Sequence, residues 1–295
     1  MTEALGVATR SQELAVADGE FAFTWSDFRQ IAQLVHSEAG IVLAESKVHL
    51  VYSRLAKRLR AIGLRNFREY CALVTSADGA DERQLMIAAM TTNVTRFFRE
   101  PHHFEYLRDH IFPSLLGGAR RGGRVRVWSA GCSSGEEAYS IGISILELLP
   151  EAAGLDVRIL ASDIDTEMLR RGSEGQYEKR QIEDVPAEMR RKWFVPVIGN
   201  KSVFEVSTEL HSLVRFRELN LLNQWPMAGR FDIIFCRNVM IYFDDKTQNE
   251  TWKRFSEVLV PGGLLCIGHS ERISAASQPY DLIGQTIYRL RRGAQ

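Results

Sequence analysis

The sequence predicts an α/β protein in which a small all-helical domain precedes a doubly wound, mostly parallel sheet. Three observations support this fold class. Amphipathic helical patterns fill residues 24–90, strand and helix patterns alternate from residue 124 onward, and a small-residue turn joins the first strand of that region to its helix. Near-continuous apolar strands separated by helices are typical of parallel sheets covered on both faces, so we expect a Rossmann-like second domain.

The composition is that of an ordinary globular protein, with 45% hydrophobic and 25% charged residues in a chain of 295. Because 37 basic and 37 acidic side chains balance, the net charge gives no reason to expect a nucleic-acid partner. The scattered cysteines form no CxxC pair, which argues against metal sites and disulfides and favours the cytoplasm. No apolar run approaches the ~20 residues of a membrane span. We therefore expect a cytoplasmic monomer without metal or direct membrane insertion.

The chain divides into a leader, a helical domain, a connector and an α/β domain. Residues 1–20 lack the basic start and apolar core of a signal peptide, and we expect them to be poorly ordered. The helical domain covers 21–90, the connector 91–123 and the α/β domain 124–295. Within the last, 176–212 interrupts the alternation with two short strand patterns around a Gly-Asn turn, which predicts a small antiparallel β-subdomain. Such an edge insertion more often docks a partner than builds a core.

Two helices of the first domain follow from capping residues and periodicity. Thr24 can cap a helix that Gly40 ends. In the next segment, SKVHLVYSRLAKRLRAIG, an apolar stripe repeats at helical spacing and basic residues gather beside it without any acid. These basic residues are Lys47, Arg54, Lys57, Arg58 and Arg60. A solvated helix face and a docking surface for an acidic partner explain them equally well.

The turn after the first strand of the α/β domain, SAGCSSGEE, does not suit a dinucleotide. Ser133 occupies the middle glycine position of the GxGxxG pattern, and Glu136 and Glu137 open the helix where a phosphate would lie. Complementing the helix dipole explains the two acids as well as a ligand does. Asp163 ends the second strand, where a carboxylate either binds ribose hydroxyls or caps the following helix. Together these residues favour S-adenosylmethionine, which carries an adenosine and a cationic end but no phosphate.

Six blocks of this sequence, in one order, resemble the motifs of chemotaxis receptor methyltransferases of the CheR family. They are TTNVTRFFREPHHF, WSAGCSSGEEAYSIGI, ASDIDTEML, FRELNLL, FDIIFCRNVMIYFD and PGGLLCIGHSE. The resemblance implies a helical domain joined to an S-adenosylmethionine-binding α/β domain with a β-subdomain insertion. It also implies methyl transfer to glutamate side chains on the cytoplasmic helices of chemoreceptors (methyl-accepting chemotaxis proteins). The products would be glutamyl methyl esters, used in sensory adaptation, and S-adenosylhomocysteine.

The same resemblance implies which residues contact the cofactor region. In chain order they are Asn93, Thr95, Arg99, Glu137, Asp163, Asn220, Leu221, Arg237 and Asn238. Among them, Glu137 would meet the methionine portion and Asp163 the ribose. Without the resemblance, a turn residue explains Asn220 and a solvated charge explains Arg237.

Carboxyl methylation needs no catalytic base, because a glutamate with a pKa of ~4.3 is already an anion at neutral pH. We therefore expect Arg99 to orient the acceptor carboxylate without transferring a proton. Tyr242 is a second candidate for lining the site, and a packed aromatic ring is an equal explanation for it. The basic residues of the helical domain would steer the acidic methylation helices.

Besides an NAD oxidoreductase, which Ser133 and the two acids disfavour, two alternative functions follow from the same residues. A nucleic-acid methyltransferase would normally show an NPPY-type motif, where this chain has RNVMIY. A non-catalytic module that senses the cofactor while bound to receptors would keep the same ligand residues. Some family members dock a peptide from the receptor C-terminus on a glycine-rich hairpin of the β-subdomain; VPVIGNKSV carries one glycine, which counts against such tethering here.

Overall fold

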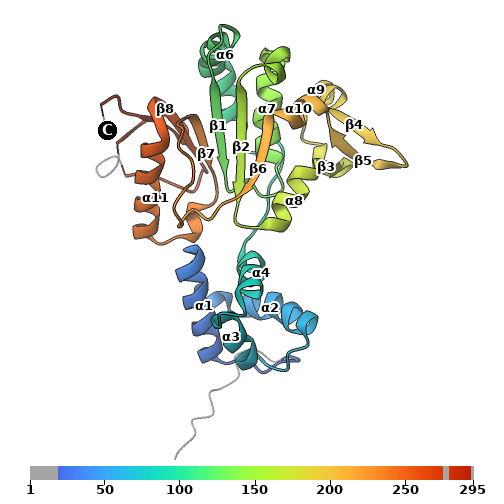
Figure 1. Cartoon of the computed structure of the whole chain (residues 1–295), viewed down its shortest axis with the longest axis vertical. Helices are drawn as coiled ribbons and strands as arrows, with labels where there is room; N and C mark the ends of the chain where they lie inside the picture. The colour runs from blue at the N-terminus through green and yellow to red at the C-terminus, as the bar shows by residue number, and fades with distance from the viewer. Residues whose placement is uncertain (1–18, 275–278, 294–295) are drawn as a thin grey trace, which may run out of the picture. The chain divides into compact units, whose positions relative to one another are not determined.

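The computed structural model describes residues 19–274 and 279–293, which form two compact units (Figure 1). The first ends at Met90 and the second begins at Thr91. The predicted leader lies, apart from its last two residues, outside the described part of the chain. No helix among the described residues has both the length and the apolar character needed to cross a membrane.

The first unit is all-helical, as predicted. Its helices are α1 (Trp25–Ala39), α2 (Val48–Ile62), α3 (Phe67–Thr75) and α4 (Ala80–Met90), with a short 3-10 turn, η1 (Glu45–Lys47). At the start of α1, the Thr24 hydroxyl accepts a hydrogen bond from the backbone N–H of Asp27, and the Asp27 carboxylate accepts one from the N–H of Thr24. Gly40 ends the helix in the left-handed region, with φ at 71°. Both predicted caps are present.

The apolar stripe of α2 faces the interior of this unit, where Val51, Leu55 and Leu59 are fully buried. An ion pair lies beside this apolar stripe. The Arg58 guanidinium donates to both carboxylate oxygens of Glu82, from Nε at 3.0 Å and from Nη2 at 2.6 Å. The buried hydroxyl of Tyr70 donates to the same carboxylate at 2.9 Å. α2 and α4 are therefore joined by charge as well as by apolar packing.

The second unit contains a seven-stranded sheet in the order β6-β2-β1-β7-β8-β10-β9 (Figure 1). The strands are β1 (Val125–Ala130), β2 (Val157–Asp163), β6 (Val214–Glu218), β7 (Phe231–Cys236), β8 (Leu259–Ile267), β9 (Tyr280–Gly284) and β10 (Ile287–Leu290). The pairs from β6 through β8 are parallel, whereas β10 runs antiparallel to both its neighbours. The predicted doubly wound, mostly parallel sheet is confirmed. The strand order reverses at β1.

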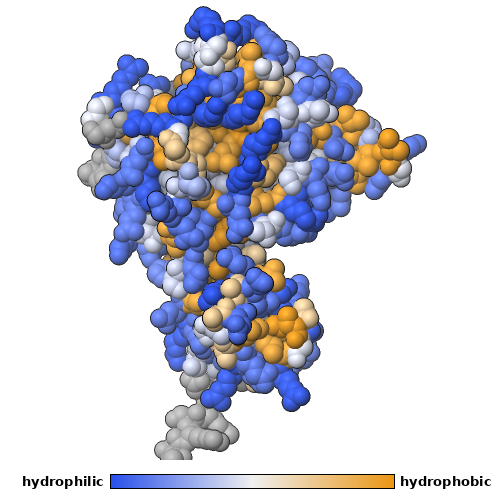
Figure 2. All heavy atoms as spheres, in the orientation of Figure 1, coloured by the Kyte–Doolittle hydropathy of each residue, from blue (hydrophilic) through white to orange (hydrophobic). Residues whose placement is uncertain are grey.

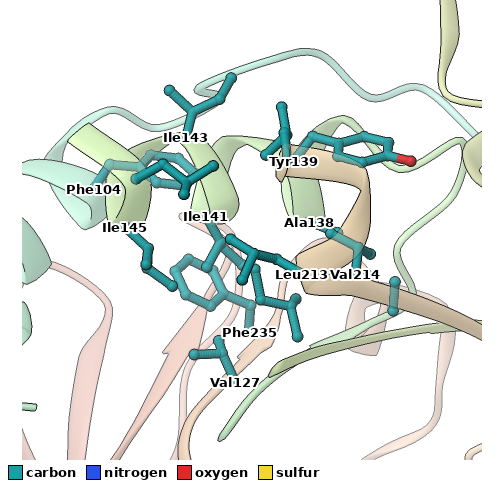
Figure 3. Packing of buried hydrophobic residues seen from close by; sticks show 14 of the residues in the cluster. Phe104, Val127, Ala138, Tyr139, Ile141, Ile143, Ile145, Leu213, Val214 and Phe235 are labelled. Carbon is teal, nitrogen blue, oxygen red and sulfur yellow. The ribbon is translucent and has the colours of Figure 1, made fainter. Parts of the chain in front are cut away.

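The second unit has helices on both sides of this sheet and one, α9, in the β-subdomain (Figure 1). They are α5 (His102–Tyr106), a π-helical turn η2 (Leu107–Ile111), α6 (Phe112–Arg120), α7 (Glu136–Leu148), α8 (Thr166–Glu174), α9 (Ala187–Trp193), α10 (Thr208–Leu213) and α11 (Asp245–Val258). Short 3-10 helices add η3 (Pro150–Gly154), η4 (Lys179–Ile182) and η5 (Met240–Tyr242). Alternate strand residues divide the core: Val127 and Phe235 pack toward α7 (Figure 3), and Trp128 packs toward α11.

A second, three-stranded antiparallel sheet confirms the predicted β-subdomain. Its strands are β3 (Gln176–Glu178), β4 (Phe194–Val197) and β5 (Asn200–Val206), in the order β3-β5-β4. The hairpin turns where expected, with Gly199 in the left-handed region at φ 84°. Hydrophobic atoms gather toward the tip of this insertion (Figure 2), where Val195 and Ile198 are exposed.

Candidate active site

The loops that follow β1, β2 and β7 converge, because these strands are parallel neighbours whose carboxyl ends lie at one edge of the sheet. The first loop begins with the backbone N–H groups of Gly131 and Cys132, which both donate to the carbonyl of Ser162 on β2. This edge, at the reversal of strand order, is the place where a doubly wound sheet offers a ligand site.

Two glycines of the first loop allow its backbone to approach neighbouring side chains closely. Gly131 has a φ of 79°, and a Cβ there would lie 2.4 Å from the side chain of Val239. Gly135 has a φ of 95°, and a Cβ there would meet the ring of Phe216 at 3.0 Å. Between them, Ser133 takes a left-handed conformation with φ at 49°. A non-glycine residue in this region stores strain, which is typical of functional loops.

Asp163 holds this loop from the end of β2. Its Oδ2 accepts the backbone N–H of Ser133 at 2.8 Å, and its Oδ1 accepts that of Asp165 at 3.0 Å. Each carboxylate oxygen keeps a lone pair for a further donor. Burial raises the pKa of Asp163. Asp165 caps α8 by accepting the N–H groups of Glu167 and Met168, so the helix-cap role belongs to Asp165 and not to Asp163.

Glu137, in the first turn of α7, is joined to Arg237 at the end of β7. Its Oε1 accepts the hydroxyl of Ser129 at 2.7 Å, and its Oε2 lies 3.1 Å from Nη1 of Arg237. Burial raises the pKa of Glu137, and the Arg237 charge opposes that effect. The side chain of Arg237 is 2% exposed. The explanation of Arg237 as a solvated charge is therefore wrong, because its partners come from distant segments of the chain.

Arg237 also anchors the connector. Its Nη2 donates to the backbone carbonyl of Arg99 and lies 3.4 Å from Oε2 of Glu100. On its other side, Glu100 accepts from His269, whose Nδ1 is 2.9 Å from Oε1. Burial alone would raise the pKa of Glu100, but the hydrogen bond from His269 and the charge of Arg237 hold it below its usual range. One guanidinium thus connects the connector, β7 and α7.

This group, which we call the Arg237 cluster, consists of Arg237, Glu100, Glu137, His103 and His269. Three of its buried atoms have no hydrogen-bond partner among the described residues: Oε2 of Glu100, Nδ1 of His103 and Nε of Arg237. The first two lie 3.8 Å apart. Burial, followed by the charge of Arg237, lowers the pKa of His103 to about 3, so its ring is neutral.

Glu100, His102 and His103 place possible metal ligands within 4.8 Å of one another. The guanidinium of Arg237 beside Glu100 disfavours a cation at this position, because like charges repel strongly when buried. The His102-His103 pair instead packs against the turn before β10, where Nε2 of His103 lies 2.9 Å from the hydroxyl of Thr286.

The predicted residues of the connector lie beside these loops. Asn93 donates from Nδ2 to Asp165 at 2.8 Å, and its carbonyl accepts the hydroxyl of Ser133. Thr95 and Arg99 are partly buried, and Nη1 of Arg99 donates to the carbonyl of Val94 at 3.0 Å. The connector therefore lies along the same edge of the sheet as the β1 and β2 loops.

The remaining predicted residues follow β6 and β7. Asn220 accepts the backbone N–H of Leu222 at 2.9 Å, as a turn residue does, and Leu221 is buried. Asn238 has a left-handed φ of 60°. Tyr242 ends η5 and is partly buried.

Sequence reasoning did not single out three residues that support the site. Glu271 accepts backbone N–H groups of the loop after β7, Glu100 belongs to the Arg237 cluster, and Tyr177 of β3 donates to the carbonyl of Ser134 at 2.7 Å. The Tyr177 ring also meets Phe97 of the connector, with centroids 5.0 Å apart. The β-subdomain thus supports the site, and is more than an edge insertion. An acid just beyond a strand, as in GHSE, was the available signal for Glu271.

The predicted basic face is divided by the structure. Lys47 and Lys57 are exposed, and Arg54 donates from Nη1 to the carbonyl of Ala89. Arg60 pairs with Glu20 at the surface. Arg58 is held by Glu82 inside the unit, which leaves it less available to a partner than the sequence suggested.

Fold and loops together define a methyltransferase of the S-adenosylmethionine-binding α/β class, with carboxylates where a dinucleotide enzyme must admit phosphate. Two family models match the chain: residues 93–289 fit the S-adenosylmethionine-binding domain of CheR methyltransferases, and residues 26–91 fit their all-alpha domain. The chain belongs to the CheR methyltransferase family. The resemblance seen in the six sequence blocks is confirmed.

Curated relatives match over nearly the whole chain. A probable chemotaxis protein methyltransferase of Rhizobium etli is 51% identical, over 87% of this chain and 96% of that protein. The chemotaxis protein methyltransferase of Escherichia coli is 42% identical, over 98% of this chain and 99% of that protein. Chemotaxis protein methyltransferase 2 of Pseudomonas aeruginosa is 44% identical, over 91% and 94% respectively.

Proposed function

We propose that this enzyme transfers the methyl group of S-adenosylmethionine to glutamate side chains on the cytoplasmic helices of chemoreceptors. The products are glutamyl methyl esters and S-adenosylhomocysteine. The observation that carries the proposal is that two carboxylates, the largely buried Glu137 and the buried Asp163, lie with a glycine loop at the reversal of strand order. Relatives named chemotaxis protein methyltransferases support the receptor as acceptor.

The carboxylates of the site fit this cofactor. Asp163 has a free lone pair on each oxygen for the ribose hydroxyls, and Glu137 offers a carboxylate to the ammonium of the methionine portion. Asn220 and Leu221 would border the adenine. The other residues that we assign to the cofactor are Asn93, Thr95, Arg99, Arg237 and Asn238. When bound, S-adenosylmethionine supplies an electrophilic methyl group on a positively charged sulfur.

The side chains of this enzyme position the glutamate that receives the methyl group, and they exchange no proton with it. A glutamate carboxylate is already a nucleophile at neutral pH. Arg99 orients that carboxylate, since a planar guanidinium matches its geometry. The carbonyl of Arg99 is bound by Arg237, which fixes the segment from which the side chain extends. Tyr242 lines the same site.

A covalent route through cysteine is disfavoured by the state of the thiols. Cys132 and Cys236 lie beside the loops, but both are buried, and burial raises the pKa of each thiol well above its usual value. They stay protonated and unreactive.

The helical unit supplies the attraction for the substrate. Methylation helices are acidic around their acceptor glutamates, and Lys47 and Lys57 present exposed positive charge to them, with Arg54, Arg58 and Arg60 nearby on α2. We expect the enzyme to act as a monomer on the cytoplasmic side of the membrane. The single-glycine hairpin of the β-subdomain argues against tethering to a receptor C-terminal peptide.

The test incubates the enzyme with methyl-labelled S-adenosylmethionine and receptor-containing membranes. We expect base-labile label on the receptor, released as methanol, because carboxyl esters hydrolyse in base and amide or amine methylation does not. Membranes without receptor are the control. Base-stable label, or binding of the cofactor without any transfer, would contradict the proposal; the second result would favour a non-catalytic sensing module.

A further inference from the structure

We propose that Glu271 is a positioning residue for methyl transfer: its buried carboxylate holds the loop after β7 in the shape that places Asn238 and Tyr242 at the site. The inference rests on the proposed function, because it assigns a role within that reaction. It concerns a residue in the turn after β8, which touches the reacting groups only through the loop that it binds.

The carboxylate of Glu271 gathers four backbone N–H groups. Oε1 accepts those of Val239 at 2.9 Å and Met240 at 2.8 Å. Oε2 accepts those of Asn238 at 3.1 Å and Gly268 at 2.5 Å. Three consecutive amides of the loop after β7 therefore point at one side chain that lies more than thirty positions further along the chain.

A strained residue and a close approach between two turns mark the loop at this point. Asn238 has a left-handed φ of 60°, a strained conformation for a residue with a side chain. A Cβ at Gly268 would lie 2.9 Å from both the Asn238 nitrogen and Oε2 of Glu271. The two turns are therefore closely packed, and the hydrogen bonds to Glu271 help to hold Asn238 in its strained conformation.

Burying this carboxylate has a cost. Glu271 is 5% exposed, and burial raises its pKa while the four N–H groups oppose that effect. A shorter, uncharged residue would serve if the turn after β8 had only to close. A buried anion that binds several amides is instead suited to hold one backbone shape against alternatives.

The decisive variant is Glu271→Gln, in the full chain. Its amide fits the same space, but the Nε2 group is a donor and faces backbone donors, so half of the contacts are lost. The matched control is Asp232→Asn. Asp232 is a partly buried carboxylate that also accepts a backbone N–H, that of Arg126 at 2.8 Å, but it lies at the opposite end of β7.

We expect three results for Glu271→Gln relative to wild type. The turnover number for receptor methylation falls about 100-fold, since displacement of a reacting group by 1 Å costs roughly that factor. The affinity for S-adenosylhomocysteine, measured by calorimetry, falls less than tenfold, because Glu137 and Asp163 are unchanged. Amide hydrogen exchange quickens over residues 238–240. Asp232→Asn, whose amide oxygen can still accept the N–H of Arg126, leaves all three quantities near wild type.

Two outcomes would overturn the inference: a Glu271→Gln enzyme with wild-type turnover, or one that loses turnover while amides 238–240 stay protected. If Glu271→Gln does not fold, Glu271→Asp, which keeps the charge on a shorter side chain, is measured in the same way. Failure of the proposed function is a distinct result. The wild type would then transfer no methyl group, whereas the exchange of the 238–240 amides would still report whether Glu271 holds the loop.

Discussion

Each unit pairs an arginine with a buried or nearly buried glutamate, and the two groups differ in how completely their polar atoms are hydrogen-bonded. In the helical unit, Arg58, Glu82 and Tyr70 satisfy one another: both oxygens of Glu82 accept, and no buried atom of the three lacks a partner among the described residues. In the α/β unit, three buried atoms of the Arg237 cluster lack a hydrogen-bond partner among the described residues. A closed group stabilises a fold, whereas an open one at a sheet edge has capacity left for a bound molecule.

Backbone strain follows the same division. The non-glycine residues with positive φ, among those described, are Phe98, Glu100, Ser133, Asn238 and Thr286. All belong to the α/β unit, and all lie in or beside the loops of the candidate site. Strain of this kind persists only where surrounding contacts enforce it, and it gathers at functional sites. The loops of the candidate site therefore contain strained backbone that lowers the stability of the α/β unit, whereas the described residues of the helical unit contain no such strain.

The largest effect is expected from breaking the open cluster. Arg237→Leu leaves Glu137 and Glu100 buried without their cation, so we expect a loss of about 3–5 kcal/mol in the free energy of unfolding, together with loss of turnover. Urea unfolding and the methylation assay measure the two quantities. A variant that keeps both wild-type stability and wild-type turnover would remove Arg237 from the account.

In the same region, Arg99→Ala is expected to lower turnover with little effect on the free energy of unfolding. Arg99 contributes its carbonyl to Arg237, and this carbonyl remains in Arg99→Ala. We expect turnover to fall about 100-fold, as for a lost transition-state contact, with little change in the free energy of unfolding. Arg96→Ala, three positions earlier on the exposed side of the connector, is the control and should keep its turnover. Equal turnover in the two variants would exclude Arg99 from the mechanism.

The histidine of the open cluster gives a pH signature. The pKa of His103 is lowered from 6.5 to about 3, chiefly by burial. Between these values the unfolded chain binds a proton that the native state does not, so the free energy of unfolding contributed by this group falls by about 2 kcal/mol from pH 7 to pH 5. The carboxyl groups are common to wild type and His103→Gln, so the difference between their unfolding curves isolates the histidine. Parallel pH dependence in the two proteins would contradict the assignment.

The smallest effect is expected from the closed group. Tyr70→Phe removes one hydrogen bond to Glu82 and leaves the ion pair with Arg58, so we expect a loss of about 1 kcal/mol in the free energy of unfolding. Turnover should equal that of the wild type, because this group only supports the helical unit. A fall in turnover without a matching fall in stability would show that the closed group is also functional.

Local signals in the sequence were enough for the fold and for the loops. Thr24 and Gly40 marked one helix correctly, and the glycines and acids of SAGCSSGEE located the carboxyl end of β1. Caps, glycine turns and apolar periodicity act between residues a few positions apart, so they can be read from one sequence. The short β9 and the π-helical turn η2 have no such signal.

The contacts that shape the site were not predictable in the same way. Without the family resemblance, Arg237 looked like a solvated charge because its partners, Arg99, Glu100 and Glu137, lie 100 to 138 positions away. Glu271 was not singled out from the sequence. Both roles depend on which loops the sheet order brings together, and that order appears only in three dimensions.

We propose that the edge of the sheet at the carboxyl ends of β1 and β2 is built for a sulfonium compound and not for a dinucleotide. Calorimetry with S-adenosylhomocysteine, S-adenosylmethionine and NAD tests it most directly, with Asp163→Asn beside the wild type. We expect the wild type to bind both sulfur compounds, Asp163→Asn to weaken their binding at least tenfold, and NAD not to bind. Tight binding of NAD, with no heat from either sulfur compound, would contradict this proposal.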